Sequence, residues 1–359
     1  MTDTVLVTGI STGFGQEIAL MLGEKGYTVY GTVRDMSLRP KLEAMAAKRN
    51  ADLRVVQMDV TDQSSIDAAV NKILEECGSI YAVVNNAGVL LRGYFEDLAE
   101  DEIRNLFNVN FFGALAVTRA VLPAMRQARR GRVVIISSVA GKIGAPSGSA
   151  YSACRFAQEG FAESLRQEMQ PLGVTVSLIE PGITRTETWQ RGTASGVGRN
   201  AANPDSPYYA WFKQAQTLFY NTMESSKITV EDVAGAVFRA ISEPKPRWRV
   251  IQMHGLADGL MEASVDYIIE ALRRPQEYVY PGYLDRQTAK IVGALDALEA
   301  RRGDLAGIDL GSITTACALG YLDFRFADKL DWRARAPGLA AWYADFAKRP
   351  SMQKTRPDA

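Results

Sequence analysis

A glycine-rich segment near the amino terminus constrains the fold of this chain more than any other feature. It reads Thr8-Gly9-Ile10-Ser11-Thr12-Gly13-Phe14-Gly15 and follows the apolar run Val5 to Val7. Glycines at this spacing let the backbone turn tightly from a strand into a helix and approach another group closely. The first N–H groups of the helix have no partner within it and suit an anion such as a phosphate. The segment therefore predicts a strand–loop–helix unit that opens an α/β domain.

Short β-rich apolar runs alternate with helical patterns as far as residue 252. The expected strands cover residues 5–7, 28–33, 54–58, 82–85, 132–137, 175–180 and 248–252. Strands that alternate with helices in this way form right-handed βαβ units. We expect an α/β fold with a doubly wound, Rossmann-type parallel sheet of seven strands. The Gly-, Ala-, Ser-, Asn- and Pro-rich stretch from Gly192 to Pro207 is expected to be a mobile loop.

The strand pattern stops after His254, and helical spacing of apolar residues replaces it. Leu284, Ile291, Leu295 and Leu298 lie at spacings typical of an amphipathic helix, and similar spacing continues towards the carboxyl terminus. We expect residues 1–253 to form the α/β domain and residues 254–359 an all-α domain.

Composition excludes several classes of function. The 41 acidic and 41 basic residues balance, so nothing favours a nucleic acid or an anionic membrane as partner. We find no apolar run long enough to span a bilayer, and a first strand at about Thr4 leaves no room for a signal peptide. The three cysteines have no metal-binding spacing, which favours a reducing cytoplasm. With His254 as the single histidine, catalysis by histidine and a metal site are not expected.

A tyrosine, a serine and a basic residue follow at a characteristic spacing. Tyr151 lies four residues before Arg155 and thirteen after Ser138. Together with the glycine segment, this arrangement resembles the short-chain dehydrogenase/reductase family, in which a tyrosine passes a proton while a nicotinamide passes a hydride. The resemblance implies Tyr151 as the acid/base, Ser138 as the partner of the substrate oxygen and Asn110 as a support of the proton relay. Ser137 is a competing choice, but the spacing to Tyr151 favours Ser138.

Arg155 stands where the family pattern Tyr-x-x-x-Lys has its lysine. A phenol has a pKa near ~10, and a cation about 4 Å away favours the phenolate by roughly 4 kcal/mol at an effective dielectric near ~20. Arginine keeps the charge and the donors towards a ribose, but it cannot release a proton and its fork is planar and bulky. Either Arg155 is a handicapped stand-in for lysine, or the pocket is adapted to a guanidinium; we favour the first.

The resemblance covers about residues 3–252 and implies cofactor-binding residues after successive strands. They are Gly9, Ser11, Gly13, Phe14, Gly15, Arg34, Asp59, Val60, Asn86, Ala87, Gly88, Tyr151, Arg155, Pro181, Gly182, Ile183 and Thr186. Among them, Asp59-Val60 is similar to the family's adenine contact, and Thr186 to its threonine near the carboxamide.

Arg34 decides the expected form of the cofactor. An acid after the second strand would bond the ribose 2′-hydroxyl of NAD, whereas an arginine accommodates the 2′-phosphate of NADP. Val33 occupies the place where the acid would stand, although Asp35 directly follows Arg34. We expect NADP(H), with NAD less favoured.

Aromatic residues gather in and after the glycine- and proline-rich stretch. They are Trp189, Tyr208, Tyr209, Trp211, Phe212, Phe219 and Tyr220. In the family, substrate loops lie in this part of the chain, so they could line the site of a sizeable apolar substrate such as an aryl ketone, a steroid or a lipid-like alcohol. Packing against the C-terminal region or a partner subunit is an equal alternative.

The C-terminal segment has a resemblance of its own. Residues 313–326, Leu339 to Tyr343 and Arg349 to Met352 are similar to the helical C-terminal domain of glutathione S-transferases. The stretch from His254 to Ala263 resembles the first helix of that domain, and Asp309 fits a helix N-cap. The chain has no thioredoxin-like domain, so glutathione is not expected as a ligand.

The sequence as a whole predicts a cytoplasmic NADP(H)-dependent oxidoreductase, a homodimer or homotetramer, that interconverts a small-molecule carbonyl and a secondary alcohol. The helical domain would be a scaffold or interaction module. One alternative is a weakly active or inactive NADP-binding protein that senses redox state or presents the helical domain to a partner, since Arg155 replaces the lysine. Another is a glutathione-linked enzyme that recruits a thioredoxin-fold partner.

Overall fold

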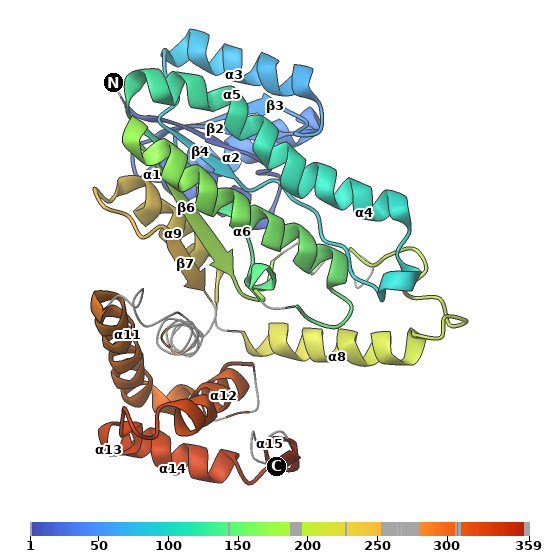
Figure 1. Cartoon of the computed structure of the whole chain (residues 1–359). Helices are drawn as coiled ribbons and strands as arrows, with labels where there is room; N and C mark the ends of the chain where they lie inside the picture. The colour runs from blue at the N-terminus through green and yellow to red at the C-terminus, as the bar shows by residue number, and fades with distance from the viewer. Residues whose placement is uncertain are drawn as a thin grey trace. The chain divides into compact units, whose positions relative to one another are not determined.

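The computed structural model describes residues 2–142, 144–186, 196–226, 228–252, 264, 267, 281–305, 307 and 310–354. The chain divides into two compact units, Met1–Met253 (unit 1) and His254–Ala359 (unit 2), and each has an apolar core of its own. Figure 1 shows strands and helices in unit 1 and helices in unit 2. The α/β fold with a helical C-terminal region is confirmed.

Unit 1 is built on a seven-stranded parallel sheet. Its strands are β1 (Thr4–Val7), β2 (Thr28–Val33), β3 (Leu53–Gln57), β4 (Ala82–Asn85), β5 (Gly131–Ile136), β6 (Val174–Pro181) and β7 (Arg249–Gln252). They lie in the order β3-β2-β1-β4-β5-β6-β7, and every neighbouring pair is parallel. The order reverses between β1 and β4, and such sheets bind ligands outside the carboxyl ends of the strands at this point.

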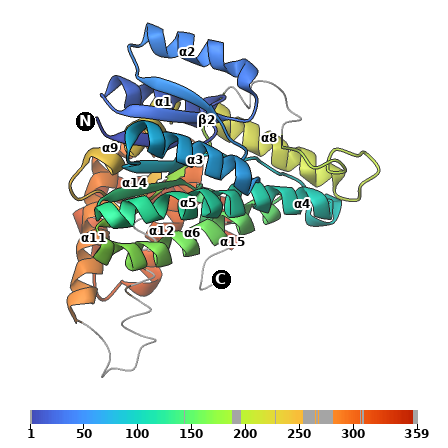
Figure 2. The same cartoon turned by 90° about the horizontal axis from the view of Figure 1, so that it is seen from above.

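Helices cover both faces of the sheet, as Figures 1 and 2 show. One face carries α1 (Gly13–Glu24), α2 (Arg39–Lys48) and α9 (Val230–Ser242), and the other carries α3 (Gln63–Cys77), α5 (Gly113–Ala128) and α6 (Ser149–Met169). Side chains alternate along each strand. Val5 and Val7 therefore lie in the core between the sheet and α1, α2 and α9, whereas Leu6 lies in the core on the other face. Because both faces are buried, the strands are apolar almost throughout.

The long helical stretch before β5 is not regular. It consists of α4 (Glu100–Phe107), a π-helical turn (Asn108–Phe112) and α5, which lie end to end in Figures 1 and 2. The π-helical turn therefore interrupts the regular helix around Asn110. By length and composition alone, Glu100–Ala128 could cross a membrane, which corrects the expectation that no stretch qualifies. Core helices of folded domains pass the same test, and Val117 and Val121 of this helix are fully buried in the sheet core.

The remaining described elements of unit 1 are short or lie outside the two helical layers. They are α8 (Tyr209–Ser225) and the 3₁₀ turns Met36–Leu38, Phe95–Asp97, Val139–Gly141 and Gln170–Leu172.

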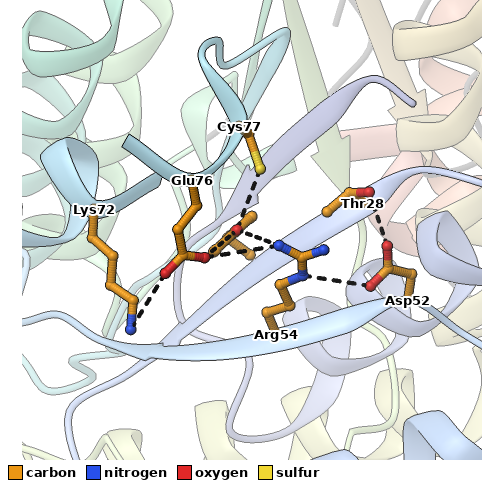
Figure 3. Close-up of polar contacts among 7 residues, drawn as sticks. Thr28, Asp52, Arg54, Lys72, Glu76 and Cys77 are labelled. Carbon is orange, nitrogen blue, oxygen red and sulfur yellow. Dashed lines mark hydrogen bonds and ion pairs between the residues drawn. The ribbon is translucent and has the colours of Figure 1, made fainter. Parts of the chain in front are cut away.

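A polar network fastens β2, β3 and α3 at the edge of the sheet where the strands begin (Figure 3). The buried Tyr30 hydroxyl donates to Glu76 Oε2 at 2.6 Å, accepts from Arg54 Nη1 at 2.7 Å and lies 3.3 Å from Cys77 Sγ. Burial, followed by the contacts with Cys77 and Glu76, raises the pKa of Tyr30, so the phenol stays protonated. Since Arg54 and Glu76 lie at the amino end of β3 and the carboxyl end of α3, this network is at the edge opposite the predicted site.

Unit 2 is helical in its described part. It contains α11 (Pro281–Ala300), a 3₁₀ turn (Arg302–Leu305), α12 (Leu310–Arg325), α13 (Trp332–Arg335), α14 (Pro337–Phe346) and α15 (Pro350–Lys354). Ile291, Leu295 and Leu298 are buried in its core, as their spacing predicts. The carboxylate of Glu299 accepts from the N–H groups of Gly338 and Leu339 at 2.9 and 2.7 Å, which stabilises the start of α14. The stretch from 254 to 263 and position 309 lie outside the described residues.

Candidate active site

The glycine segment forms the turn between β1 and α1 at the carboxyl end of β1. Gly9 has a φ of +72°, a conformation that favours glycine. Gly15 lies so close to the turn that an added Cβ would meet Gly9 O at 2.2 Å and Asn86 Nδ2 at 2.3 Å. Both positions therefore require glycine. Ser11 is half-buried in the turn, and Phe14 packs against the core beneath α1.

The end of β4 is fastened to this turn. The Thr8 hydroxyl accepts from the N–H groups of Asn86 and Ala87, both at 3.0 Å, while Asn86 Nδ2 donates to Thr8 O and Gly9 O, both at 2.9 Å. Thr8 is absent from the site residues predicted from the sequence, although a hydroxyl at the end of β1 is visible there. The two loops thus form one rigid surface at the point where the strand order reverses.

Three predicted residues lie after β2 and β3. Asp59 accepts from the N–H and the hydroxyl of Thr61 at 2.9 and 2.7 Å, and these hydrogen bonds lower its pKa. Val60 is buried, and Arg34 is exposed. The neighbouring Asp35 is an N-cap: its carboxylate accepts from Ser37 N at 2.9 Å in its own turn.

The segment after β6 returns to the glycine turn. Pro181 is the last residue of β6, and Gly182 and Ile183 follow it half-buried. An added Cβ on Gly13 would lie 3.5 Å from Thr186 Cβ, so Thr186 adjoins the glycine turn. The structure therefore brings the glycine turn, the end of β4 and the end of β6 together along one edge.

The two serines after β5 differ in their contacts. Ser137 is buried and donates to Glu159 Oε1 at 2.6 Å. Ser138 is half-buried and accepts from Ala140 N at 3.2 Å as the cap of a short 3₁₀ turn. Its own hydroxyl hydrogen is not used in that contact, so Ser138 is the serine with a donor to offer a ligand.

Tyr151 and Arg155 lie one turn apart on α6 and face each other. The guanidinium carbon of Arg155 lies 4.9 Å from the centroid of the Tyr151 ring. Arg155 is only 8% exposed, so its charge is poorly screened by water. The ring of Tyr151 packs against an apolar cluster that includes Leu98 and Cys154, and burial raises the pKa of the Cys154 thiol to about 11. That thiol is therefore unsuited to act as a nucleophile.

Asn110 is fully buried in the π-helical turn. Its side chain pairs with the backbone of Val89: Asn110 Oδ1 accepts from Val89 N at 2.7 Å, and Asn110 Nδ2 donates to Val89 O at 2.8 Å. The backbone carbonyl of Asn110 accepts from Gln158 Nε2 at 2.7 Å. Gln158 Oε1 in turn accepts from Arg155 Nη1 at 2.7 Å. A buried chain of contacts thus joins Arg155, Gln158 and Asn110, and Gln158 is absent from the residues predicted from the sequence.

Two features of this edge fit a bound dinucleotide. A side chain at Gly88 would meet Asn110 Oδ1 at 3.2 Å and Arg155 Nη2 at 3.5 Å, so the glycine keeps the space beside these groups open. Arg155 Nε is buried without a hydrogen-bond partner among the described residues, which suits a donor towards a ribose hydroxyl.

An ionic cluster that the sequence does not predict adjoins Ser137, which donates to one of its members, Glu159. Arg249 on β7 pairs with Glu180 Oε1 at 2.8 Å, Glu159 Oε2 at 3.0 Å and Glu163 Oε1 at 2.8 Å. Burial raises the pKa of the fully buried Glu180 to about 8, the Glu159 carboxylate adds to the rise, and Arg249 opposes it. Glutamates on a helix and at a strand end carry no signal of such proximity in the sequence.

The residues around the start of α8 form a partly aromatic surface. Tyr208 stacks on Tyr94 with ring centroids 5.1 Å apart, and the exposed Trp211 lies 6.2 Å from Tyr208. Phe212 is instead buried. Position 189 lies outside the described residues.

The described part of the expected mobile loop, residues 196–207, is held in place. Gly198 N donates to Arg92 O at 2.8 Å, Arg199 N donates to Glu102 Oε1 at 2.9 Å, and the Ser206 hydroxyl bonds Asp97 at 2.8 Å. Small polar residues therefore form turns here that fasten to neighbouring segments.

Two family models match parts of this chain. A model described as short chain dehydrogenase matches residues 3–196, and one described as glutathione S-transferase, C-terminal domain, matches residues 281–345. The first match spans 194 of the 359 residues.

Several curated proteins are similar to the α/β unit. A 3-ketodihydrosphingosine reductase from Bacteroides thetaiotaomicron is 39% identical over 203 residues, which are 56% of this chain and 72% of the relative. Retinol dehydrogenase 8 from Bos taurus is 35% identical over 258 residues, 68% of this chain and 80% of the relative. The 17-beta-hydroxysteroid dehydrogenase type 1 from Homo sapiens is 32% identical over 254 residues, 68% of this chain and 76% of the relative.

Solved structures agree with these relatives. A short-chain dehydrogenase from Streptomyces avermitilis has a TM-score of 0.62 and 29% identity, covering 84% of this chain and 99% of that one. A metagenomic short-chain oxidoreductase in complex with NADP has a TM-score of 0.55 and 25% identity, covering 70% of this chain and 97% of that one. This chain belongs to the short-chain dehydrogenase family of oxidoreductases, and it carries a C-terminal region similar to that of glutathione S-transferases.

Proposed function

We propose that this protein interconverts a carbonyl and a secondary alcohol with NADP(H). The observation that carries the proposal is the contact between the half-buried Tyr151 and the buried Arg155, whose guanidinium carbon lies 4.9 Å from the centroid of the phenol ring. Tyr151 would exchange a proton with the substrate oxygen, and Ser138 would hold that oxygen with its free hydroxyl hydrogen. The nicotinamide, when bound, supplies or accepts the hydride.

The electrostatics of the pair suit this role. A cation close to a phenol favours its ionised form, and a buried cation acts through a lower dielectric than an exposed one. Arginine is suited to supply such a charge, because its guanidinium does not release its proton in proteins. We therefore infer that Arg155 biases Tyr151 by its field and bonds the nicotinamide ribose through its Nε.

NADP is the form of the cofactor that the contacts favour. The exposed Arg34 follows β2, and the neighbouring Asp35 carboxylate already accepts a hydrogen bond within its own turn. Arg34 would bind the 2′-phosphate of NADP. The metagenomic relative bound to NADP supports this proposal.

An apolar substrate fits the aromatic surface and the relatives. Tyr94, Tyr208 and Trp211 cluster beside the start of α8. The relatives are named for a ketosphingoid base, a retinol and a hydroxysteroid, each a lipid-like molecule. We propose a substrate of this class, and the test is NADPH oxidation with a panel of aryl ketones, steroid ketones, retinoid aldehydes and long-chain ketones.

One observation favours a second candidate, an NADP-binding protein of weak or no activity. Arg155 Nη1 donates to both Ile136 O and Gln158 Oε1, so this end of the guanidinium is committed to the protein. NADPH that raises the melting temperature without being oxidised by any carbonyl of the panel would favour this candidate.

Unit 2 would serve as a scaffold or interaction module in a cytoplasmic homo-oligomer. Its own core and its likeness to a glutathione S-transferase domain support a separate module. The mass in solution and the NADPH oxidation rate of the full chain and of residues 1–253 test this role. An unchanged number of subunits, unchanged solubility and unchanged activity after truncation would make unit 2 an independent appendage. Retention of the full chain on immobilised glutathione would instead favour a glutathione-linked activity.

A further inference from the structure

Gln158 lies one turn after Arg155 on α6 and is 2% exposed. Both ends of its carboxamide are used: Oε1 accepts from Arg155 Nη1 at 2.7 Å, and Nε2 donates to Asn110 O at 2.7 Å. An apolar side chain would fill the same space, yet a carboxamide that must match a donor and an acceptor stands here. A buried carboxamide that uses both its donor and its acceptor in this way specifies one arrangement of its partners.

The partners of Gln158 are two groups that the proposed reaction needs in place. Arg155 Nη1 also donates to Ile136 O at 3.0 Å, so the guanidinium is held from the end of β5 and from α6 at once. These two contacts set the position of the guanidinium over the Tyr151 ring. Asn110 lies in a π-helical turn, where regular helix hydrogen bonds are interrupted. Its backbone carbonyl accepts a hydrogen bond from Gln158.

We propose that Gln158 is a positioning residue, which holds the Arg155 guanidinium at Tyr151 by joining it to the Asn110 carbonyl. This inference rests on the proposed role of Tyr151. It makes Arg155 and Gln158 one unit: the arginine carries the charge, and the carboxamide sets its position.

Two variants separate positioning from packing. Gln158→Met keeps the length and volume of the side chain but removes both hydrogen bonds. We expect kcat to fall about tenfold or more, because small displacements of catalytic groups have effects of this size or larger. NADPH should also bind more weakly, because the Arg155 Nε donor moves with the guanidinium; fluorescence titration measures this without turnover.

Gln158→Glu keeps an acceptor for Arg155 and adds a charge. The carboxylate would form an ion pair with the guanidinium and offset its field at Tyr151, while facing the Asn110 carbonyl without a donor. We expect the alkaline limb of the pH–rate profile to move up by about one pH unit. A carboxylate without contact to the Arg155 and Tyr151 pair would not move this limb. If the methionine variant does not fold, this variant carries the test.

The matched control is Thr28→Val. It also removes a side-chain hydrogen bond of a buried residue, here the one from the Thr28 hydroxyl to Asp52 at 2.8 Å. This contact lies at the opposite edge of the sheet (Figure 3). Turnover, pH profile and NADPH affinity should stay within about twofold of the wild type. The inference is overturned if both Gln158 variants behave like this control while Tyr151→Phe is inactive. Retained activity in Tyr151→Phe would instead overturn the proposed function itself.

Discussion

Ser137 donates to Glu159 Oε1 at 2.6 Å, and this contact separates two adjacent serines that the sequence makes nearly equivalent. Ser137 is bound into the buried cluster of Glu159, Glu180 and Arg249, whereas Ser138 keeps a hydroxyl hydrogen for a ligand. We therefore assign Ser137 to the stabilisation of the sheet edge and Ser138 to the candidate site.

We predict opposite consequences for the two alanine variants. Ser138→Ala should lower kcat about 100-fold, the scale for removing one donor to a reacting oxygen, with little change in melting temperature. Ser137→Ala should leave kcat closer to the wild type and cost about 1.5–3 kcal/mol of unfolding free energy, as expected for a hydrogen bond to a charged group. Steady-state kinetics and denaturant unfolding measure both. The reverse pattern would exchange the roles of the serines.

Removing the phenol hydroxyl should abolish proton transfer. Tyr151→Phe keeps the ring and its contact with Arg155, and turnover should fall by at least ~100-fold. The control is Tyr30→Phe, which removes a hydroxyl from the network at the other edge of the sheet and should change stability rather than turnover. If Tyr151→Phe retains most of its activity, another group is the acid/base.

Much of unit 1 could be predicted because its sheet is buried on both faces. Each observed strand boundary lies within one residue of its expected position, since continuous apolar runs end where the glycine and asparagine turns begin. Helix geometry was harder: nothing in the run around Asn110 distinguishes a π-helical turn from a regular helix, because the difference depends on tertiary contacts such as Gln158.

The candidate site could be predicted only in part for the same reason. Motifs indicate which residues lie at the carboxyl ends of strands, and the glycine turn does adjoin Asn86 and Thr186. Motifs do not indicate side-chain partners. Gln158 and Glu180 have no pattern of their own, and only the packing of α6 against the π-helical turn and β6 brings them to Asn110 and Glu159.

NADPH should stabilise the protein more than NADH at equal concentration, since only NADPH offers a 2′-phosphate to Arg34. Arg34→Gln should remove this preference and weaken NADPH binding about tenfold or more, the scale for a charge-assisted hydrogen bond. Arg39→Gln is a suitable control, because Arg39 is exposed nearby and pairs with Glu43. Thermal shift with each cofactor measures the outcome. Equal shifts in the wild type would contradict the NADP assignment.

The free energy of unfolding should fall as the pH rises from weakly acidic to weakly alkaline, because of Glu180. Its pKa rises from an ordinary 4.5 to about 8 in the folded chain, so the folded state holds a proton that the unfolded state releases. This contribution is fully present below the unfolded pKa and is lost as the pH rises through the folded one. Glu180→Gln should flatten the dependence of unfolding free energy on pH from 5 to about 8.

The half-exposed Glu163, which also pairs with Arg249, provides the control for that experiment. Glu163→Gln should keep the slope of the wild type, because its removal leaves Glu180 buried beside Glu159. Urea unfolding at several pH values gives the slopes. An unchanged slope in Glu180→Gln would show that another group carries the dependence.

Arg155→Lys is the variant for which the structure reverses the expectation from the sequence. From the family pattern alone, lysine would restore a compact charge and a relay, and kcat would rise. The contacts of Arg155 argue otherwise, because the shorter lysine has one nitrogen with which to reach Ile136 O and Gln158 Oε1, both bonded by Arg155 Nη1, and to replace the Nε donor offered to a ligand. Buried acceptors left without donors cost about 1–3 kcal/mol each. We therefore predict a lower melting temperature and a lower kcat.

The matched control for Arg155→Lys is Arg166→Lys, an equal exchange on the same helix, where the guanidinium lies 5.4 Å from the Trp248 ring. It should leave kcat unchanged. Kinetics across pH 6 to about 10, a range that ends at the ordinary pKa of a phenol, compare the three proteins. A rise in kcat in Arg155→Lys, with the alkaline limb moved to lower pH, would show that lysine serves better than the guanidinium. A fall that Arg166→Lys does not share would make Arg155 and Gln158 an adapted pair, because the loss would then come from the contacts of this one guanidinium.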